Sequence, residues 1–126
     1  MSKPKGSNKA NLEKTRNHLI ALARQEFAKH GFHAASTNHL IKIAGSSRGT
    51  LYHHFKDKKE VFRAIYDSMS QEIAERLEKF PYSAHNPIKN LIDGCTEYLR
   101  IFTENDFAQI ILIDGPNVLG LAYCQS

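Results

Sequence analysis

A glycine turn between two short amphipathic segments, within residues 37–60, constrains the fold of this chain more than any other feature. The turn is Gly45-Ser46. Because glycine has no Cβ, it can adopt the positive φ that ends one helix and lets the next one leave at a steep angle. Ser47 then offers a side chain that can cap the following helix. The pattern predicts two short helices around a turn, followed by a third that Asp57 can cap.

The second of these helices, over residues 48–54, carries side chains suited to nucleic acid. Two helices joined at a steep angle by a turn that contains glycine form a helix-turn-helix unit, whose second helix fits the DNA major groove. Leu51 and Phe55 are predicted to point into the core. The residues predicted to point outward are donors and amphipathic groups that suit phosphates and base edges: Arg48, Thr50, Tyr52 and His53.

Charge is distributed unevenly along the chain, in agreement with this interpretation. Residues 1–59 contain 12 Lys and Arg against 3 Asp and Glu, a net charge of +9, whereas residues 60–126 contain 5 against 10, a net charge of −5. A polyanion is therefore expected to dock on one end of the molecule only. Many charge runs are simply solvated surface, but here the basic half coincides with the helix-turn-helix.

The same residues resemble the DNA-binding domain of the TetR/AcrR transcriptional regulators. The resemblance rests on Ala44-Gly45, on the pattern Ser47-x-Gly49-Thr50-Leu51-Tyr52-x-His54-Phe55, and on Lys58. Further upstream, residues typical of the family's first helix and turn occur at the expected places: Arg16, Ile20, Ala23, Phe27, Gly31 and Thr37. The resemblance covers residues 12–66, about half of the chain.

This resemblance implies an all-α fold with three parts. Residues 1–11 are expected to be a flexible basic arm, and residues 12–60 the three-helix helix-turn-helix domain that binds DNA. Residues 61–126 are expected to hold a connector helix and part of a ligand-binding and dimerisation domain. Members of the family are usually longer, so the resemblance also implies a truncated regulatory domain.

The function that the resemblance implies is sequence-specific regulation of transcription, by a repressor that responds to an effector. The implied partners are a double-stranded DNA operator, a small-molecule effector that the sequence does not identify, and a second copy of the chain in a homodimer. Arg48 is expected to make a bidentate contact with guanine or phosphate. Tyr52 is expected to bind phosphate, and Thr37 and Lys58 are expected to bind the DNA backbone. The full set of predicted DNA-binding residues is Thr37, Ser47, Arg48, Gly49, Thr50, Tyr52, His53 and Lys58.

Hydrophobic periodicity predicts further helices on both sides of this motif. One is expected over residues 12–29. The short helix before Gly45 is expected to turn Leu40, Ile43 and Ala44 towards the core. A long helix is expected from residue 58 to Pro81, with an apolar stripe at Phe62, Ile65, Met69, Ile73 and Leu77. Another is expected to begin at Asn86-Pro87, with proline at its tolerated first position. Residues 107–113 fit a strand or a buried helix by period alone, and the helical context favours a helix. Asp114-Gly115-Pro116 is predicted to be a turn.

The second half of the chain has apolar and aromatic residues with two possible roles. The helix after Asn86 has a wide apolar face, on which Cys95 is predicted to be a small buried hydrophobic residue. Three aromatic residues could line an effector pocket or simply fill the core: Tyr98, Phe102 and Phe107.

Other classes of function find little support in the sequence. His30 and His33 flank a glycine, His53 and His54 point to different faces of a helix, and nothing completes a metal-binding set, so no metal or other cofactor is expected. No phosphate loop, nucleophile elbow or paired carboxylates suggest an enzyme. No membrane-spanning run or signal-peptide pattern is visible, so a cytoplasmic location is predicted.

One alternative remains open at this stage. The chain could be a truncated helical protein-interaction module that no longer binds DNA productively and pairs with a partner through exposed apolar helices. Binding by such a module is expected to depend little on salt, whereas binding to DNA is expected to weaken steeply as salt rises.

Overall fold

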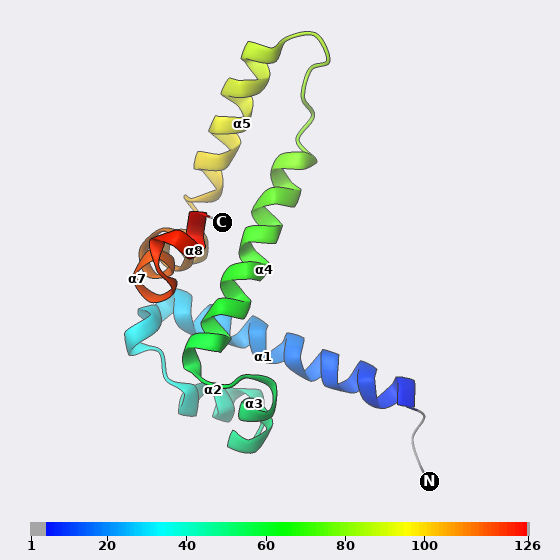
Figure 1. Cartoon of the computed structure of the whole chain (residues 1–126), viewed down its shortest axis with the longest axis vertical. Helices are drawn as coiled ribbons and strands as arrows, with labels where there is room; N and C mark the ends of the chain where they lie inside the picture. Colours follow the sequence, from blue (N-terminus) through cyan, green and yellow to red (C-terminus); the bar gives the residue numbers. More distant parts are fainter. Residues whose placement is uncertain (1–4, 126) are drawn as a thin grey trace.

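The computed structural model describes the backbone of residues 5–125 and the side chains of residues 11–125, and this part of the chain is helical without any strand (Figure 1). The elements are α1 (Lys5–Ala34), α2 (Thr37–Ala44), α3 (Arg48–His54), α4 (Lys58–Glu78), α5 (Pro87–Ile101), α6 (Asn105–Phe107), the π-helix η1 (Ala108–Asp114), α7 (Gly115–Leu119) and α8 (Leu121–Gln125). The all-α prediction is confirmed. None of the described helices is long and apolar enough to cross a bilayer.

Helix α1 is longer than the sequence pattern predicted. It begins at Lys5, so residues 5–11 of the expected flexible arm have a helical backbone, while residues 1–4 lie outside the described residues. Near its other end the backbone leaves the helical conformation at Gly31, with φ 78° and ψ 166°. This kink agrees with the predicted role of Gly31 and turns the chain towards α2.

The core of the N-terminal part forms where α1, α2, α3 and α4 meet. Phe62 on α4 is fully buried, and its ring lies edge-on to Phe27 and Phe32, with centroids 5.6 and 5.4 Å away. The predicted inward residues are buried in this core: Leu40, Leu51, Phe55, Ile65, Met69 and Ile73. The buried stripe of α4 therefore follows the predicted helical period.

Helix α2 corrects one core prediction. Ile43 was expected to face the core, but its side chain is 46% exposed, and Ile41 packs against the core instead. Successive residues of a helix are about 100° apart, so Ile41 and Ile43 lie equally far on either side of a core face centred on Leu40 and Ala44. The helical period alone therefore could not decide which of the two is covered.

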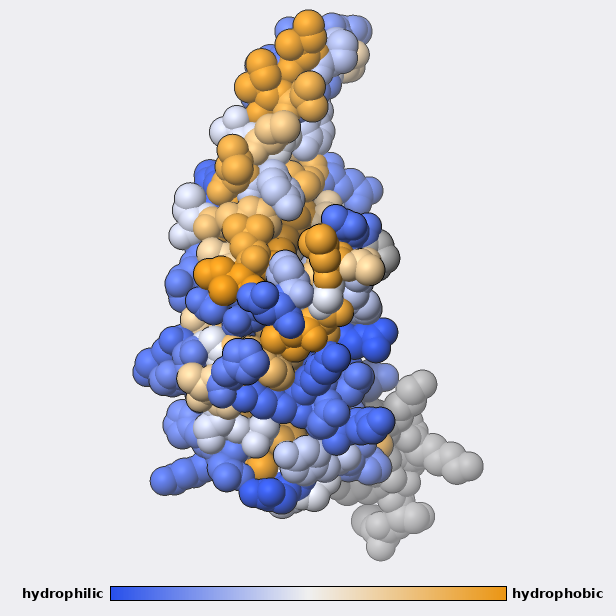
Figure 2. Space-filling model, turned by 60° about the vertical axis from the view of Figure 1, so that its left-hand side comes forward, coloured by the Kyte–Doolittle hydropathy of each residue, from blue (hydrophilic) through white to orange (hydrophobic). Residues whose placement is uncertain are grey.

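Helices α4 and α5 run side by side as a long hairpin that projects from the rest of the molecule (Figure 1). Asn86 caps α5, since its Oδ1 accepts a hydrogen bond from the Lys89 N–H at 3.0 Å. The predicted apolar face of α5 exists, but it is largely exposed, at Ile88, Leu91, Ile92, Tyr98 and Leu99. Figure 2 shows the hydrophobic surface gathered on this projecting end, with hydrophilic surface at the opposite end.

Cys95 belongs to this exposed face, so the prediction of a buried cysteine is wrong for the described chain. The helical period correctly placed Cys95 among apolar residues. It could not show that the neighbouring α4 covers only part of that face.

The C-terminal elements pack back against α1 and α4. Residues 107–113 are helical, as the context favoured, although seven residues from Ala108 to Asp114 form a π-helix. The turn predicted at Asp114-Gly115-Pro116 is wrong, because the chain continues directly into α7. Pro116 lies in the first turn of α7, where proline is tolerated. Gly115 fits closely against Tyr66, and an added Cβ would lie 2.7 Å from its ring.

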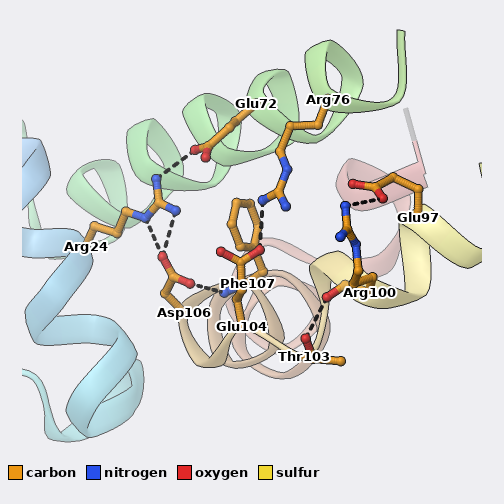
Figure 3. A network of polar contacts seen from close by, with 9 residues as sticks. All are labelled: Arg24, Glu72, Arg76, Glu97, Arg100, Thr103, Glu104, Asp106 and Phe107. Atoms are coloured by element: carbon orange, nitrogen blue, oxygen red, sulfur yellow. Dashed lines mark hydrogen bonds and ion pairs between the residues drawn. The ribbon is translucent and has the colours of Figure 1, made fainter. Parts of the chain in front are cut away.

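A network of charged side chains connects these C-terminal elements to α1 (Figure 3). The Arg24 Nε donates to Asp106 Oδ2 at 2.8 Å, and Arg24 Nη1 donates to Glu72 Oε2 at 2.8 Å. The guanidinium also lies over the Phe107 ring, 4.9 Å from its centroid. One arginine on α1 thus binds α4 and α6 together.

A second set of hydrogen bonds joins the π-helix to the kink of α1. The Phe32 N–H donates to the buried carboxylate of Asp114 at 2.9 Å, and Gln109 Nε2 donates to the same oxygen at 3.1 Å. The end of the π-helix therefore holds the segment that leads into the helix-turn-helix.

Candidate nucleic-acid interface

The position of α2 is fixed at its N-terminus by a cap and by a buried carboxylate. Ser36 Oγ accepts a hydrogen bond from the His39 N–H at 3.1 Å, which caps the helix. Glu26 of α1 is buried, and it accepts hydrogen bonds from the Ser36 N–H at 3.2 Å and from His39 Nδ1 at 2.9 Å. Burial alone would raise the pKa of Glu26, but these hydrogen bonds outweigh it and the pKa is lowered. The charged carboxylate thus joins α1 to α2.

The turn between α2 and α3 has the geometry that the sequence predicted. Gly45 has φ 63° and ψ 29°, which is left-handed backbone. The Gly45 N–H donates to the Lys42 carbonyl at 3.2 Å, and the Ser46 N–H donates to the Ile41 carbonyl at 3.1 Å. These two bonds make a Schellman motif, which satisfies the last carbonyl groups of α2.

Replacing Gly45 with valine is expected to lower the free energy of unfolding by about 1–3 kcal/mol. Nothing lies within 4 Å of an added Cβ, so the cost comes from the positive φ alone. Gly45→Asn is the matched control. Because asparagine tolerates left-handed backbone, this variant should lose much less free energy of unfolding than Gly45→Val. Chemical denaturation of both variants measures the difference. Equal stability of Gly45→Val and the parent would mean that the turn relaxes without strain.

Helix α3 begins at a second cap and presents a narrow exposed face. Ser47 Oγ accepts a hydrogen bond from the Thr50 N–H at 3.1 Å and lies 2.9 Å from the Thr50 hydroxyl. Leu51 is fully buried, which fixes the rotation of the helix. Within α3 the exposed residues are Arg48, Gly49, Tyr52 and His53. They lie on one side because Tyr52 follows Gly49 by three positions, and the pairs Arg48–Tyr52 and Gly49–His53 are each four positions apart.

Arg48 is held across the motif by a residue that the sequence did not single out. Its Nη2 donates a hydrogen bond to Oδ1 of Asn38, which lies in the first turn of α2. Both side chains are exposed. Gly49 lies beside Arg48 with open space around it, since an added Cβ would meet only Ser47 Oγ, at 3.8 Å.

Thr37 and Lys58 lie at the N-termini of α2 and α4 and line one small pocket. Lys58 is only partly exposed. Its Nζ donates to the His33 carbonyl at 3.3 Å and lies 4.7 Å from the centroid of the Phe32 ring. Burial lowers the pKa of Lys58. The structure thus brings together the two residues predicted to hold the DNA backbone and gives Lys58 contacts within the protein as well.

The two histidines at the end of α3 differ in their surroundings. His53 is exposed, whereas His54 is partly buried and its ring lies 6.3 Å from that of Phe55. Burial lowers the pKa of His54, and the nearby His53 and Arg16 lower it further. The two histidines thus point to different faces of α3, as the sequence predicted, with His54 towards Phe55 and His53 outward.

The three aromatic residues suggested for an effector pocket do not share a single site. Tyr98 lines an open apolar groove between the end of α4 and α5, together with Leu77, Tyr82, Leu91 and Leu99. Phe102 stacks edge-on against Tyr98, with centroids 4.8 Å apart, and packs against the core. Phe107 is buried between Arg24 and Arg76 and fills the core, which was the alternative role. Among the described residues, no group of three or more His, Cys, Asp or Glu side chains could hold a metal ion.

Comparison with known proteins assigns this helical arrangement to a family. The family profile described as "Bacterial regulatory proteins, tetR family" matches residues 19–65, from the middle of α1 into α4. A crystal structure of a TetR-family transcriptional regulator from Pectobacterium atrosepticum is 35% identical, with a TM-score of 0.77 over 88% of this chain and 57% of that one. The chain belongs to the TetR/AcrR family.

Curated TetR-family relatives agree with this assignment. The HTH-type transcriptional regulator UidR of Escherichia coli K12 is 33% identical over 101 residues, which is 79% of this chain and 48% of UidR. The HTH-type transcriptional regulator AcrR of Shigella flexneri is 36% identical over 77 residues, which is 58% of this chain and 36% of AcrR. The chain thus matches half or less of the length of these relatives.

Proposed function

We propose that this chain binds duplex DNA through α3 and serves as a sequence-specific regulator of transcription. The observation that carries the proposal is the exposed face of α3, which the caps and the Gly45 turn hold in a helix-turn-helix. This face combines a guanidinium, a phenol and an imidazole with a bare glycine. It lies in the half of the chain that has a net charge of +9, so it can approach a polyanion.

Six of the predicted residues are assigned contacts with DNA in this proposal. Arg48 makes a bidentate contact with a guanine edge or a phosphate. Tyr52 and His53 contact phosphates or base edges beside it. The Thr50 methyl and hydroxyl lie at the edge of the same face. Thr37 and Lys58 hold the DNA backbone from two helix N-termini, where N–H groups and the helix dipole favour anions.

Replacing Arg48 with alanine is expected to weaken binding to the preferred duplex about 10- to 100-fold and to relax the preference at one base pair. The measurement is a titration of duplexes that differ at single base pairs, selected by the parent chain from a randomised library. Lys89→Ala is the matched control, because Lys89 is an exposed cation on α5, far from α3 in the fold. Equal affinity of Arg48→Ala and the parent would remove α3 from the interface.

Replacing Gly49 with alanine separates DNA binding from folding. The fold has room for the methyl group, and alanine favours a helix over glycine by about 1 kcal/mol, so the stability should stay the same or rise. We expect affinity for duplex DNA to fall several-fold, because the methyl group intrudes where a DNA backbone comes close. Thermal unfolding and DNA titration of this variant test the two halves of the prediction. Unchanged affinity would mean that DNA does not approach position 49.

Regulation by a small-molecule effector and assembly as a homodimer are further parts of the proposal. The apolar groove that contains Tyr98 is the part of the described chain best suited to an apolar effector. The exposed face of α5 supports the alternative of a helical interaction module. Light scattering shows whether copies associate, and a DNA titration at rising salt separates the two functions.

A further inference from the structure

The hydrogen bond from Arg48 to Asn38 spans the two helices of the helix-turn-helix. Arg48 opens α3, and Asn38 lies in the first turn of α2. Both side chains are exposed, on the side of the motif that the proposed function turns towards DNA. Asn38 is thus the hydrogen-bond partner of the residue to which we assign base recognition.

The contact is poorly placed to stabilise the fold. Water competes for exposed hydrogen bonds, so their net contribution to stability is small. The two helices are already joined by buried Leu40 and Leu51 and by the Gly45 turn. The contact therefore acts mainly on the conformation of the Arg48 side chain.

An arginine that binds a base must give up much of its rotamer freedom. Asn38 removes part of that freedom before DNA arrives, which lowers the cost of binding. The bond uses one N–H of Nη2, and a guanidinium has five N–H donors in a planar fork. The remaining donors are enough for a bidentate contact with guanine O6 and N7.

We propose that Asn38 is a positioning residue that orients the Arg48 guanidinium for base recognition. This inference rests on the proposed function, because it assigns Asn38 a role in the same DNA interface. Asn38 acts through Arg48 in this proposal, whereas a direct contact of Asn38 with a base would act independently of Arg48. A double-mutant cycle distinguishes these two cases.

The experiment compares four proteins: the parent, Asn38→Ala, Arg48→Ala and the double variant. Each is titrated with the duplex that the parent selects from a randomised library and with single-base-pair variants of that duplex. Asn38→Ala is expected to lose about three- to tenfold in affinity and to relax discrimination at the same base pair as Arg48→Ala. In the Arg48→Ala background, Asn38→Ala should change affinity by less than about twofold. Thermal unfolding should be the same in all four, because both residues are exposed.

Two results would overturn the proposal while the proposed function stands. In one, Arg48→Ala loses affinity but Asn38→Ala binds like the parent. In the other, Asn38→Ala costs the same in both backgrounds, which means that Asn38 contacts DNA directly. Parent-like binding by Arg48→Ala is a different failure, because it removes Arg48 from the interface and overturns both proposals.

Discussion

Replacing Phe62 with alanine is expected to lower the free energy of unfolding by about 3–5 kcal/mol. Phe62 is fully buried where α1 meets α4, with its ring edge-on to Phe27 and Phe32. Removing the ring leaves a cavity beside two aromatic rings and ends both edge-on contacts, which themselves contribute to stability. Chemical denaturation followed by circular dichroism measures the loss.

The control for Phe62 is an apolar residue in an exposed position. Ile88 is 71% exposed, so Ile88→Ala should change stability by about 0.5 kcal/mol or less. Similar losses for Phe62→Ala and Ile88→Ala would show that the centre of the core does not lie at Phe62. If the free energy of unfolding of Phe62→Ala falls close to zero, this variant should also lose DNA binding. The caps and turn of the helix-turn-helix depend on this core.

Replacing Arg24 with methionine is expected to cost about 2 kcal/mol of stability. The change removes the bonds to Asp106 and Glu72 and leaves two partly buried carboxylates without their cation. The Arg24 side chain is 26% exposed, so the loss should lie below that for a fully buried pair and above that for a surface pair. Methionine keeps an apolar side chain of similar length but removes the guanidinium over the Phe107 ring, so the measured loss includes that contact as well as the two ion pairs.

Lys89→Met is the matched control for Arg24→Met. Lys89 pairs with Asp93 at 2.8 Å on the surface of α5, four residues along the same helix. Such exposed pairs contribute about 0.3–0.5 kcal/mol. If Arg24→Met and Lys89→Met lose the same small amount of stability, the network of Arg24, Glu72 and Asp106 in Figure 3 stabilises the fold no more than an ordinary surface pair.

Features that depend on neighbouring residues were predictable from the sequence. The left-handed Gly45, the caps at Ser47 and Asp57, and proline in the first turn of α5 each follow from the chemistry of a few adjacent residues. Most of the exposed face of α3 followed as well, because burial of Leu51 fixes the direction of its neighbours. Thr50 is the exception, since it is partly buried and its hydroxyl lies 2.9 Å from Ser47 Oγ.

Features that depend on distant residues were not predictable. Arg24 meets Asp106 across 82 positions, and Phe32 meets Asp114 across the same separation. The turn signals at residues 114–116 were overridden by packing of Gly115 against Tyr66. Asn38 gave no signal of its own, since a polar residue in the first turn of a helix is common. Its contact with Arg48 depends on the angle between α2 and α3.

The basic end of this chain is proposed to bind duplex DNA through α3. The most direct test measures its affinity, as salt rises from 50 to 200 mM, for the duplex it selects and for a scrambled duplex of equal length. We expect tighter binding to the selected duplex and a steep linear fall of log affinity with log salt for both duplexes, because bound phosphates release counterions. Binding that is absent at low salt, or that does not change with salt, would contradict the claim.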